Sequence, residues 1–198
     1  MQSEVSICNQ ALFHMGTTRR IAALSDVSEE AQACRLFYEP ARDALLSGHP
    51  WLFATASVQL PLKVESSAYG RYVYGYPTNC LSIRRVYADG DTTSHDAYKI
   101  LRGGDGGKVV VCDVPGAWAD FTYKVADPLE FPPLFAEALA WRLAVDLCLP
   151  LKGDSASLRG DIMQYYLAAR SRAIVADANE QHNEERTDYY RRYVTARS

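Results

Sequence analysis

The chain has 198 residues and a formal net charge of −3 at pH 7, and 48% of its residues are hydrophobic. This length fits one domain, or one domain that carries an insertion. The composition excludes a wholly disordered chain, because so many apolar side chains can offset the entropy lost on ordering. With 21 basic and 24 acidic residues, the chain also lacks the basic excess of proteins that wrap nucleic acid.

The first helix is expected over residues 2–15. Ser3 is suited to the N-cap position, and Gly16 is suited to the left-handed position that ends a helix. A second helix is expected over residues 28–47 with Ser28 as its cap, and Pro40 predicts a kink or a break near residues 37–39. The apolar stripe expected on this second helix comprises Val27, Ala31, Cys34, Tyr38, Ala41 and Leu45.

Between residues 55 and 126 the pattern changes to short runs rich in Val, Ile, Tyr and Thr, separated by turn residues. Such runs without helical periodicity between them predict an antiparallel sheet, folded as a small sandwich or barrel. The glycine-rich segment 103–107 fails the P-loop spacing and is expected to be a hairpin tip. The strands are expected at residues 56–62, 72–74, 82–88, 98–101, 108–112 and 120–125.

Helical periodicity returns near Pro132 and is expected to end at Pro150 and Gly153. Apolar residues cover most of this helix, which predicts a central position with burial on several sides. A last helix is expected over residues 155–178, with Tyr165 and Ala176 on its apolar stripe, followed by a polar remainder.

The sequence therefore predicts an α+β fold in which an antiparallel bundle of about four helices carries an inserted small antiparallel β domain and a C-terminal tail. Residues 1–53 and 129–182 would form the two halves of the bundle. Residues 54–128 would form the β domain, and residues 183–198 the tail.

No pattern of residues indicates catalysis, a cofactor or a metal site. The five cysteines are scattered, without a CxxC motif or metal-ligand spacing to a histidine, which predicts buried hydrophobic side chains in a reducing compartment rather than disulfides. His49 is expected to be a loop histidine that packs on an aromatic ring. A small cytosolic hydrolase or ligand-binding protein that uses a cleft Cys or His remains an alternative.

The chain is not expected to enter a membrane. Its first residues lack the layout of a signal peptide, and its most apolar run, residues 138–151, is too short and too charged to cross a bilayer.

The C-terminal segment has an unusual composition, with tyrosine and arginine interleaved and few aliphatic residues. These two residue types are enriched where protein interfaces bind most strongly, so the segment is expected to dock into a partner's groove. A solvated tail is the alternative. The candidate partner-binding residues are Tyr189, Tyr190, Arg191, Arg192 and Tyr193.

Three stretches of sequence occur in a characteristic order. The first is residues 7–12 (ICNQAL) through Gly16, followed by residues 20–24 (RIAAL). The second comprises residues 28–34 (SEEAQAC), 37–46 (FYEPARDALL) and 49–54 (HPWLFA). The third is residues 127–128 (DP) with 135–144 (FAEALAWRLA), and residues 74–81 (YGYPTNCL) and 84–87 (RRVY) lie between. Together they resemble the head-to-tail adaptor family of short-tailed bacteriophages, also called tail tubular protein A or gatekeeper-type adaptors, over most of residues 3–178.

This resemblance implies a structural virion protein without enzyme activity and without a cofactor. It implies a homo-oligomeric ring, typically a dodecamer, between the portal protein and the tail nozzle protein. DNA would pass through the lumen without sequence-specific binding, and contact with tail fibres is left open. The protein would be assembled in the host cytoplasm and reside in the virion tail. On this basis the portal is the partner we expect for the C-terminal segment, which itself does not match the family's sequence.

Overall fold

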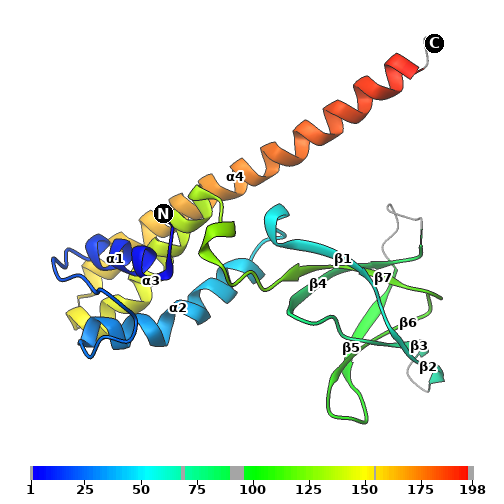
Figure 1. Cartoon of the computed structure of the whole chain (residues 1–198), viewed down its shortest axis with the longest axis horizontal. Coiled ribbons are helices and arrows are strands. Elements are labelled where there is room, and N and C mark those ends of the chain that lie inside the picture. Colours follow the sequence, from blue (N-terminus) through cyan, green and yellow to red (C-terminus); the bar gives the residue numbers. More distant parts are fainter. Residues whose placement is uncertain (1, 68–69, 90–95, 154, 196–198) are drawn as a thin grey trace. The chain divides into compact units, whose positions relative to one another are not determined.

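A computed structural model describes the backbone of residues 2–67, 70–89, 96–153 and 155–195, and the side chains of these residues except 66, 67, 70 and 181–195. Over this part of the chain there are four α-helices and seven β-strands, and the strands form two antiparallel sheets (Figure 1). The predicted α+β fold class is confirmed. None of the described helices combines the length and the apolar character needed to cross a bilayer.

The chain divides into two compact units. The helical unit comprises Met1–Phe53 and Val125–Ser198, and the β unit comprises Ala54–Lys124. The β unit ends a few residues before the predicted boundary at 128, because the segment from Val125 onward contacts the helical unit and enters a short 3-10 helix at Pro128–Glu130. A second 3-10 helix, Leu52–Ala54, lies where the chain leaves the helical unit.

Helix α3 (Pro133–Lys152) is the centre of the helical unit. It contacts α1 (Glu4–His14), α2 (Glu29–Ser47) and α4 (Ala156–Thr195), whereas α1 and α2 contact each other much less. Its buried side chains point to all three neighbours, as the nearly continuous apolar pattern predicts. They are Phe135, Ala136, Ala138, Leu139, Ala140, Leu143, Ala144, Val145, Leu147 and Cys148.

The ends of the first helix are fixed by the residues expected there. Ser3 caps α1 in a capping box with Ser6, and Gly16 adopts a φ of 70°, which favours glycine. The connector that follows is held against α1 by Asn9. Its side chain donates to the Ile21 carbonyl at 3.0 Å and accepts from the Ile21 N–H at 2.9 Å.

Helix α2 begins after the Ser28 cap and runs through Pro40, so of the predicted kink or break near residues 37–39 the break does not occur. The missing proline N–H removes one backbone hydrogen bond, but buried Tyr38 and Ala41 hold both sides of Pro40 in the core. Val27 is 88% exposed because it precedes the cap and is not helical, so it does not belong to the stripe.

The other two helices compare differently with the sequence-based expectation. Helix α3 ends at Lys152 with Gly153 as its C-cap, as predicted, although Pro150 lies inside the last turn, where a proline removes only one hydrogen bond. Helix α4 continues to Thr195 instead of ending near residue 178, since no Gly or Pro follows Gly160. Tyr165 is 58% exposed and is not part of the buried stripe of α4, and Ala176 is only half-buried.

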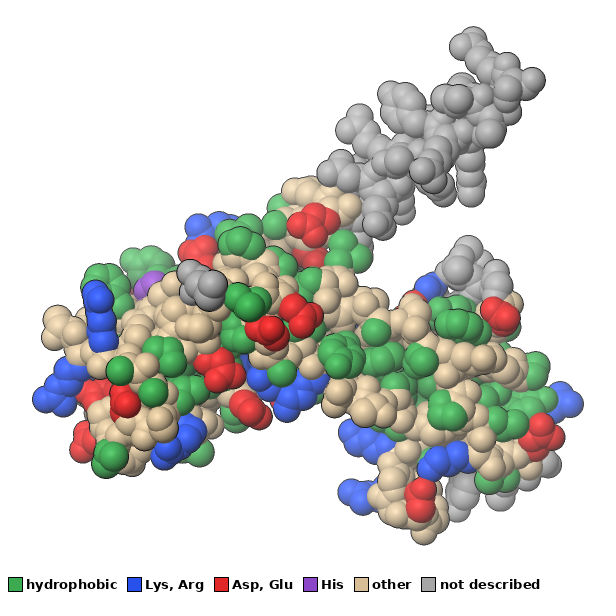
Figure 2. All heavy atoms as spheres, in the orientation of Figure 1, with side chains coloured by type: hydrophobic (Ala, Val, Ile, Leu, Met, Phe, Trp, Pro, Cys, Tyr) green, Lys and Arg blue, Asp and Glu red, His purple; other side chains and the backbone are tan. Residues whose placement is uncertain are grey.

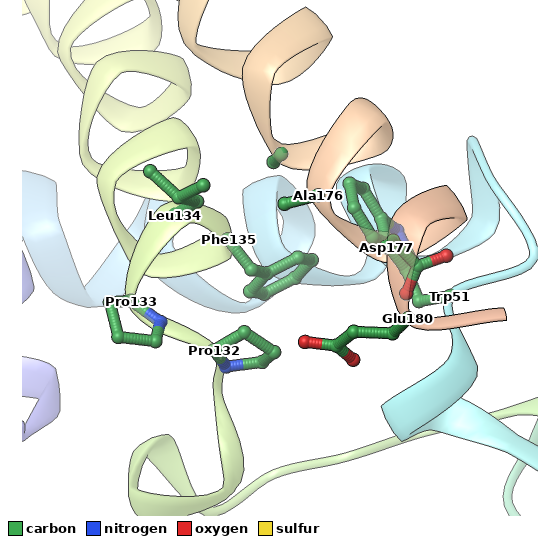
Figure 3. Close-up of a pocket in the computed structure, with 9 residues that line it drawn as sticks. Trp51, Pro132, Pro133, Leu134, Phe135, Ala176, Asp177 and Glu180 are labelled. Atoms are coloured by element: carbon green, nitrogen blue, oxygen red, sulfur yellow. The ribbon is translucent and has the colours of Figure 1, made fainter. Parts of the chain in front are cut away.

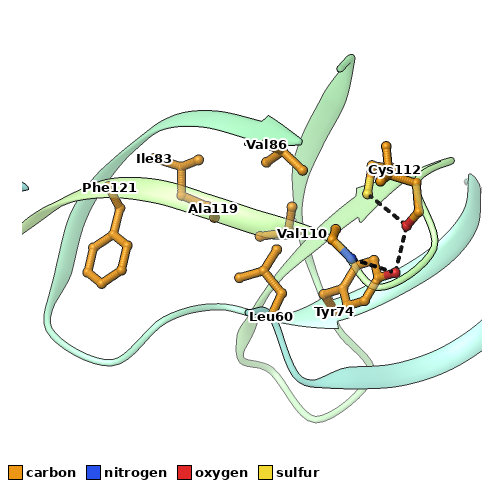
Figure 4. Packing of buried hydrophobic residues seen from close by; sticks show 10 residues of the cluster. Leu60, Tyr74, Ile83, Val86, Val110, Cys112, Ala119 and Phe121 are labelled. Atoms are coloured by element: carbon orange, nitrogen blue, oxygen red, sulfur yellow. Dashed lines mark hydrogen bonds between the residues drawn. The ribbon is translucent and has the colours of Figure 1, made fainter. Parts of the chain in front are cut away.

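The β unit contains two sheets. One has the order β1 (Thr55–Gln59), β7 (Trp118–Tyr123), β4 (Cys80–Tyr87), and the other has the order β2 (Leu62–Ser67), β3 (Gly70–Gly75), β6 (Lys108–Cys112), β5 (Tyr98–Arg102). A single hydrophobic cluster contains residues of both antiparallel sheets, so the sheets share one core (Figure 4). In this core the Tyr74 hydroxyl donates to the Val114 carbonyl at 2.6 Å.

Two details of the strands bear on the predictions. The expected strand over residues 56–62 is wrong, because Leu60 and Pro61 separate β1 from β2 and the chain changes sheet there. The glycine-rich segment forms the predicted hairpin tip between β5 and β6, where Arg102 pairs with Lys108 and Gly106 has a φ of 79°.

A β-bulge places two consecutive arginines of β4 where they reach polar groups of β7. Ile83 pairs with Phe121 and Arg85 with Asp120, so Arg84 is the extra residue between them. Arg84 Nε donates to Thr122 Oγ1 at 2.8 Å. Arg85 donates from Nε to Asp120 Oδ2 at 2.8 Å, and its Nη2 lies 2.6 Å from the same oxygen.

Asp120 is the centre of a hydrogen-bond network across this sheet. Its carboxylate also accepts from the Ser57 hydroxyl at 2.5 Å and from the Tyr87 hydroxyl at 3.0 Å. Burial alone would raise the pKa of Asp120, but these donors and the Arg85 charge outweigh it and hold the pKa below its ordinary value. One carboxylate therefore ties all three strands of the sheet together.

We expect Asp120→Ala to lower the free energy of unfolding of the β unit by about 2–3 kcal/mol, because three donors lose a charged acceptor. The contribution of Asp120 to stability, taken as the difference between wild type and variant, should be constant above the ordinary aspartate pKa of 3.8 and should fall as the pH drops through the lower folded-state value. Urea unfolding at several pH values measures both effects. The control is Asp105→Asn, since Asp105 pairs with Lys63 at 2.7 Å on the exposed surface, where solvent screens the pair. Equal losses in the two variants would contradict this assignment.

Candidate functional site

Helix α4 packs on the helical unit along one side only. Ile162, Ala169, Ala173 and Asp177 are buried and recur at spacings of three, four or seven residues, which places them on one face. The opposite face of the same turns is open to solvent. This arrangement leaves the outer side of the described turns of α4 available to a partner.

We define the α4 outer face as the six exposed residues on the side away from the buried ones. None of the six is charged, and Leu167 and Val175 are 47% and 59% exposed. An exposed helix face normally carries charged side chains, so an uncharged face over this length is a candidate interaction surface. Several members follow the alternating spacing of four and three residues that is typical of helix–helix seams. The residues are Gln164, Leu167, Ala168, Ser171, Val175 and Ala178.

Two further large apolar side chains are exposed on the first two helices. Phe13 on α1 is 72% exposed and Leu36 on α2 is 66% exposed. Figure 2 shows hydrophobic side chains at the surface of the helical unit among basic and acidic ones. The helical unit thus has exposed apolar side chains on more than one helix.

Asp177 fixes the position of α4 relative to the end of α2. It is only 7% exposed; its Oδ1 accepts from the Leu52 N–H at 2.9 Å, and its Oδ2 lies 3.1 Å from His49 Nε2. Arg170 Nη2 adds a bond of 3.0 Å to the Gly48 carbonyl. These contacts connect α4 to the segment just after α2 by directed hydrogen bonds as well as by packing.

A small apolar pocket lies beside Asp177, between the start of α3 and α4 (Figure 3). Its lining includes Pro132, Phe135 and Ala176, with the Glu180 carboxylate at its edge. Trp51 belongs to the same wall; its Nε1 donates to the Leu45 carbonyl at 3.0 Å, and its ring meets Phe135 edge-on at 5.1 Å. Aromatic, proline and alanine side chains therefore form most of the pocket wall.

Asp177, which lines the pocket, forms a pair with His49, and His–Asp pairs also occur in catalytic sites. However, its lining residues include no Ser, Thr or Cys that the pair could activate. His49 also packs edge-on against Trp51 at 4.7 Å, which confirms the expected loop histidine on an aromatic ring. The arrangement is suited to holding α4 in place and to receiving an apolar side chain.

A surface stack of three rings joins α1, α3 and α4. His14 lies parallel to Trp141 at 3.6 Å, and Trp141 stacks on Tyr165 at 4.9 Å. Burial lowers the pKa of His14, against the opposing effect of Glu137, so the ring is neutral at pH 7. This stack explains why Tyr165 can be exposed and still be ordered.

The residues predicted to bind a partner lie on the C-terminal end of α4. The backbone there is helical to Thr195, but the side chains of Tyr189, Tyr190, Arg191, Arg192 and Tyr193 lie outside the described residues. The sequence analysis missed both the α4 outer face and Asp177. Asp177 could have been found from its spacing, because it continues the buried stripe of Ala169 and Ala173. A carboxylate on such a stripe needs hydrogen-bond partners once it is buried.

Among the described side chains, no three His, Cys, Asp or Glu residues gather in a way that could hold a metal ion. A comparison with protein-family models and with curated proteins finds no match to this chain. The resemblance to the phage adaptors therefore stays a prediction.

We expect Asp177→Ala to lower the free energy of unfolding of the helical unit by about 2–3 kcal/mol, because the Leu52 N–H and His49 both lose their buried acceptor. Urea unfolding followed by circular dichroism measures this loss. Asp161→Ala is the matched control, since Asp161 lies on the same helix but is exposed. If the two variants unfold at the same urea concentration, Asp177 does not hold α4.

Proposed function

We propose that this protein is a structural subunit of a homo-oligomeric ring, the head-to-tail adaptor of a short-tailed phage, which joins the portal to the tail nozzle and forms part of the DNA conduit. The single observation that carries the proposal is the α4 outer face, a solvent-exposed helix face without charge. We infer the kind of assembly from the sequence stretches that resemble the adaptor family and from their order in the chain.

The chemistry of the α4 outer face is suited to packing against another protein helix. Ala168, Ser171 and Ala178 are small enough for a second helix to approach closely, while Leu167 and Val175 provide apolar area. Burying each of these two side chains contributes on the order of 1–2 kcal/mol. In a ring every subunit repeats the contact, so a modest interface is sufficient.

A cyclic ring uses two different surfaces of each subunit, because its interfaces are head-to-tail. The α4 outer face supplies one such surface. The exposed apolar side chains Phe13 and Leu36, which belong to α1 and α2, are candidates for the other. The small net charge of −3 also suits a conduit, since a strongly basic lumen would retain the phosphates of passing DNA.

The C-terminal end of α4 is assigned to the portal in this proposal. Residues 189–198 contain three arginines and no acidic residue, together with the three tyrosines of the predicted docking site. Tyrosine rings would enter apolar pockets of the portal, and the arginines would pair with acidic groups at the rim. Charged contacts of this kind make binding sensitive to salt.

We expect the double variant Leu167→Glu with Val175→Glu to lose ring formation, because two buried charges would face the neighbouring subunit. Its unfolding free energy should stay within about 0.5 kcal/mol of wild type, since both positions are exposed in the monomer. Light scattering after size exclusion, with and without purified portal, measures assembly.

The matched control for this variant is Asp161→Lys, which changes a charge on an exposed part of α4 outside the defined face. It should assemble like wild type. A wild-type chain that stays monomeric in the presence of portal and hydrolyses a small ester would overturn the proposal in favour of the cleft enzyme.

A chain that ends at Asn183 tests the portal contact separately. Ring formation should persist, because the α4 outer face is intact, while portal binding should weaken at least about tenfold and lose much of its salt dependence. Binding at low and moderate salt is measured by interferometry on immobilised portal. Unchanged affinity with unchanged salt dependence would refute the docking role of the C-terminal segment.

A further inference from the structure

The pocket beside Asp177 combines an apolar wall with negative charge. Side chains such as Trp51, Pro132 and Phe135 supply the carbon surface of the wall. The charged residues that line the pocket are Asp177 and Glu180, and the lining includes no Lys or Arg. The pocket therefore has two carboxylates without a permanently positive group between them.

The Asp177 carboxylate has capacity for a further hydrogen bond. It is only 7% exposed; its Oδ1 accepts from the Leu52 N–H at 2.9 Å, and its Oδ2 lies 3.1 Å from His49 Nε2. A carboxylate has about four acceptor sites, so these two contacts do not fill it. His49 carries a positive charge only when it is protonated. A cation that reached Asp177 through the pocket would therefore find an acceptor with negative charge.

The second carboxylate lies at the edge of the pocket, as Figure 3 shows for Glu180. Residues that follow at spacings of three, four and seven share its side of a helix. In this sequence they are Asn183, Glu184 and Thr187, and none of them is basic. Helix α4 thus brings no basic residue of its own to this edge.

The pocket has room for about one side chain. Its volume is about 100 Å³, and an apolar cavity of about 150 Å³ is large enough to hold benzene. Arginine fits both the wall and the edge, because it joins an aliphatic stem to a charged head group. Its guanidinium also forms two parallel hydrogen bonds with a carboxylate, which the ammonium group of lysine cannot do.

We propose that this pocket binds an arginine side chain presented by a partner protein. The methylene stem packs against Pro132 and Phe135, and the guanidinium reaches Glu180 at the edge and Asp177 in the wall. Charge decides the occupant, since a purely apolar side chain would remove water from the carboxylates and give them no partner in return. This inference does not depend on the proposed role in a phage.

The experiment titrates the 15N-labelled full-length protein with a capped short peptide that has one arginine among alanines. The chain has three tryptophans, whose indole N–H signals report on separate places, and Trp51 is the one that lines the pocket. Phe substitutions, one at a time, assign the three signals. We expect the Trp51 signal to shift until it saturates, while the signals of Trp118 and Trp141 stay in place.

Two further peptides test the chemistry of the head group. Citrulline has nearly the shape of arginine but no charge, so its peptide should bind at least about tenfold more weakly. The lysine peptide should also bind less tightly than the arginine peptide, because it lacks the paired hydrogen bonds. Binding of the arginine peptide should weaken as the ionic strength rises.

Variants of α4 test the two parts of the pocket. Glu180→Gln removes the charge at the edge and should weaken binding of the arginine peptide about threefold, with a smaller salt dependence. Asp161→Asn is the matched control, since it removes one negative charge from an exposed position on the same helix outside the pocket lining. It should bind as wild type does.

The second variant, Ala176→Leu, fills the pocket and leaves both carboxylates in place. It should abolish the Trp51 shift for every peptide, and circular dichroism checks that the variant is folded. Glu180→Gln keeps the proposal testable if the larger side chain disturbs the fold, because Glu180 is exposed.

Four results would overturn the proposal. They are equal binding of the citrulline or lysine peptide, equal binding to Glu180→Gln and Asp161→Asn, and a peptide-induced shift at Trp118 or Trp141 in place of Trp51. The fourth is a Trp51 shift that follows the protein concentration without any peptide and disappears in a chain that ends at Asn183. The occupant would then be a second copy of this chain and not a different protein.

Discussion

The burial of α3 on all its sides is the constraint on which the helical unit depends. Helices α1, α2 and α4 are brought together because each covers a different part of this one apolar helix. Since α1 and α2 contact each other little, most of their stabilisation comes from α3 and not from a mutual interface. A change in α3 therefore acts on three helices at once, whereas a change in α1 or α4 remains more local.

Directed polar contacts then fix the register of packed elements, which hydrophobic packing alone does not determine. Packing alone would allow α4 to slide or rotate along α3, because small residues such as Ala169 and Ala173 make similar contacts in neighbouring registers. Asp177, which accepts from the Leu52 N–H and contacts His49, adds directed contacts that favour the observed register. In the β unit Asp120 has the same effect, since its donors come from both neighbouring strands.

The sequence predicted features that depend on local chemistry. The caps Ser3 and Ser28, the left-handed Gly16 and the hairpin tip at 103–107 were all correct, because each is decided within a few residues. It did not predict the buried state of Asp177, which depends on contacts between distant segments. It expected a kink or a break at Pro40, whereas α2 continues through this residue with Tyr38 and Ala41 buried on either side of it.

The two faces of α4 have different roles, one in folding and one in association. The buried face must satisfy Asp177 and fill space beside α3, so its residues are constrained by folding of the monomer. The outer face contributes nothing to that core, yet it lacks the charges that would keep an exposed helix apart from other proteins. An uncharged face is an aggregation hazard for a monomer, and the hazard disappears when a second surface covers it. Because folding and association use opposite sides of α4, substitutions on the outer face can change assembly while the fold stays intact.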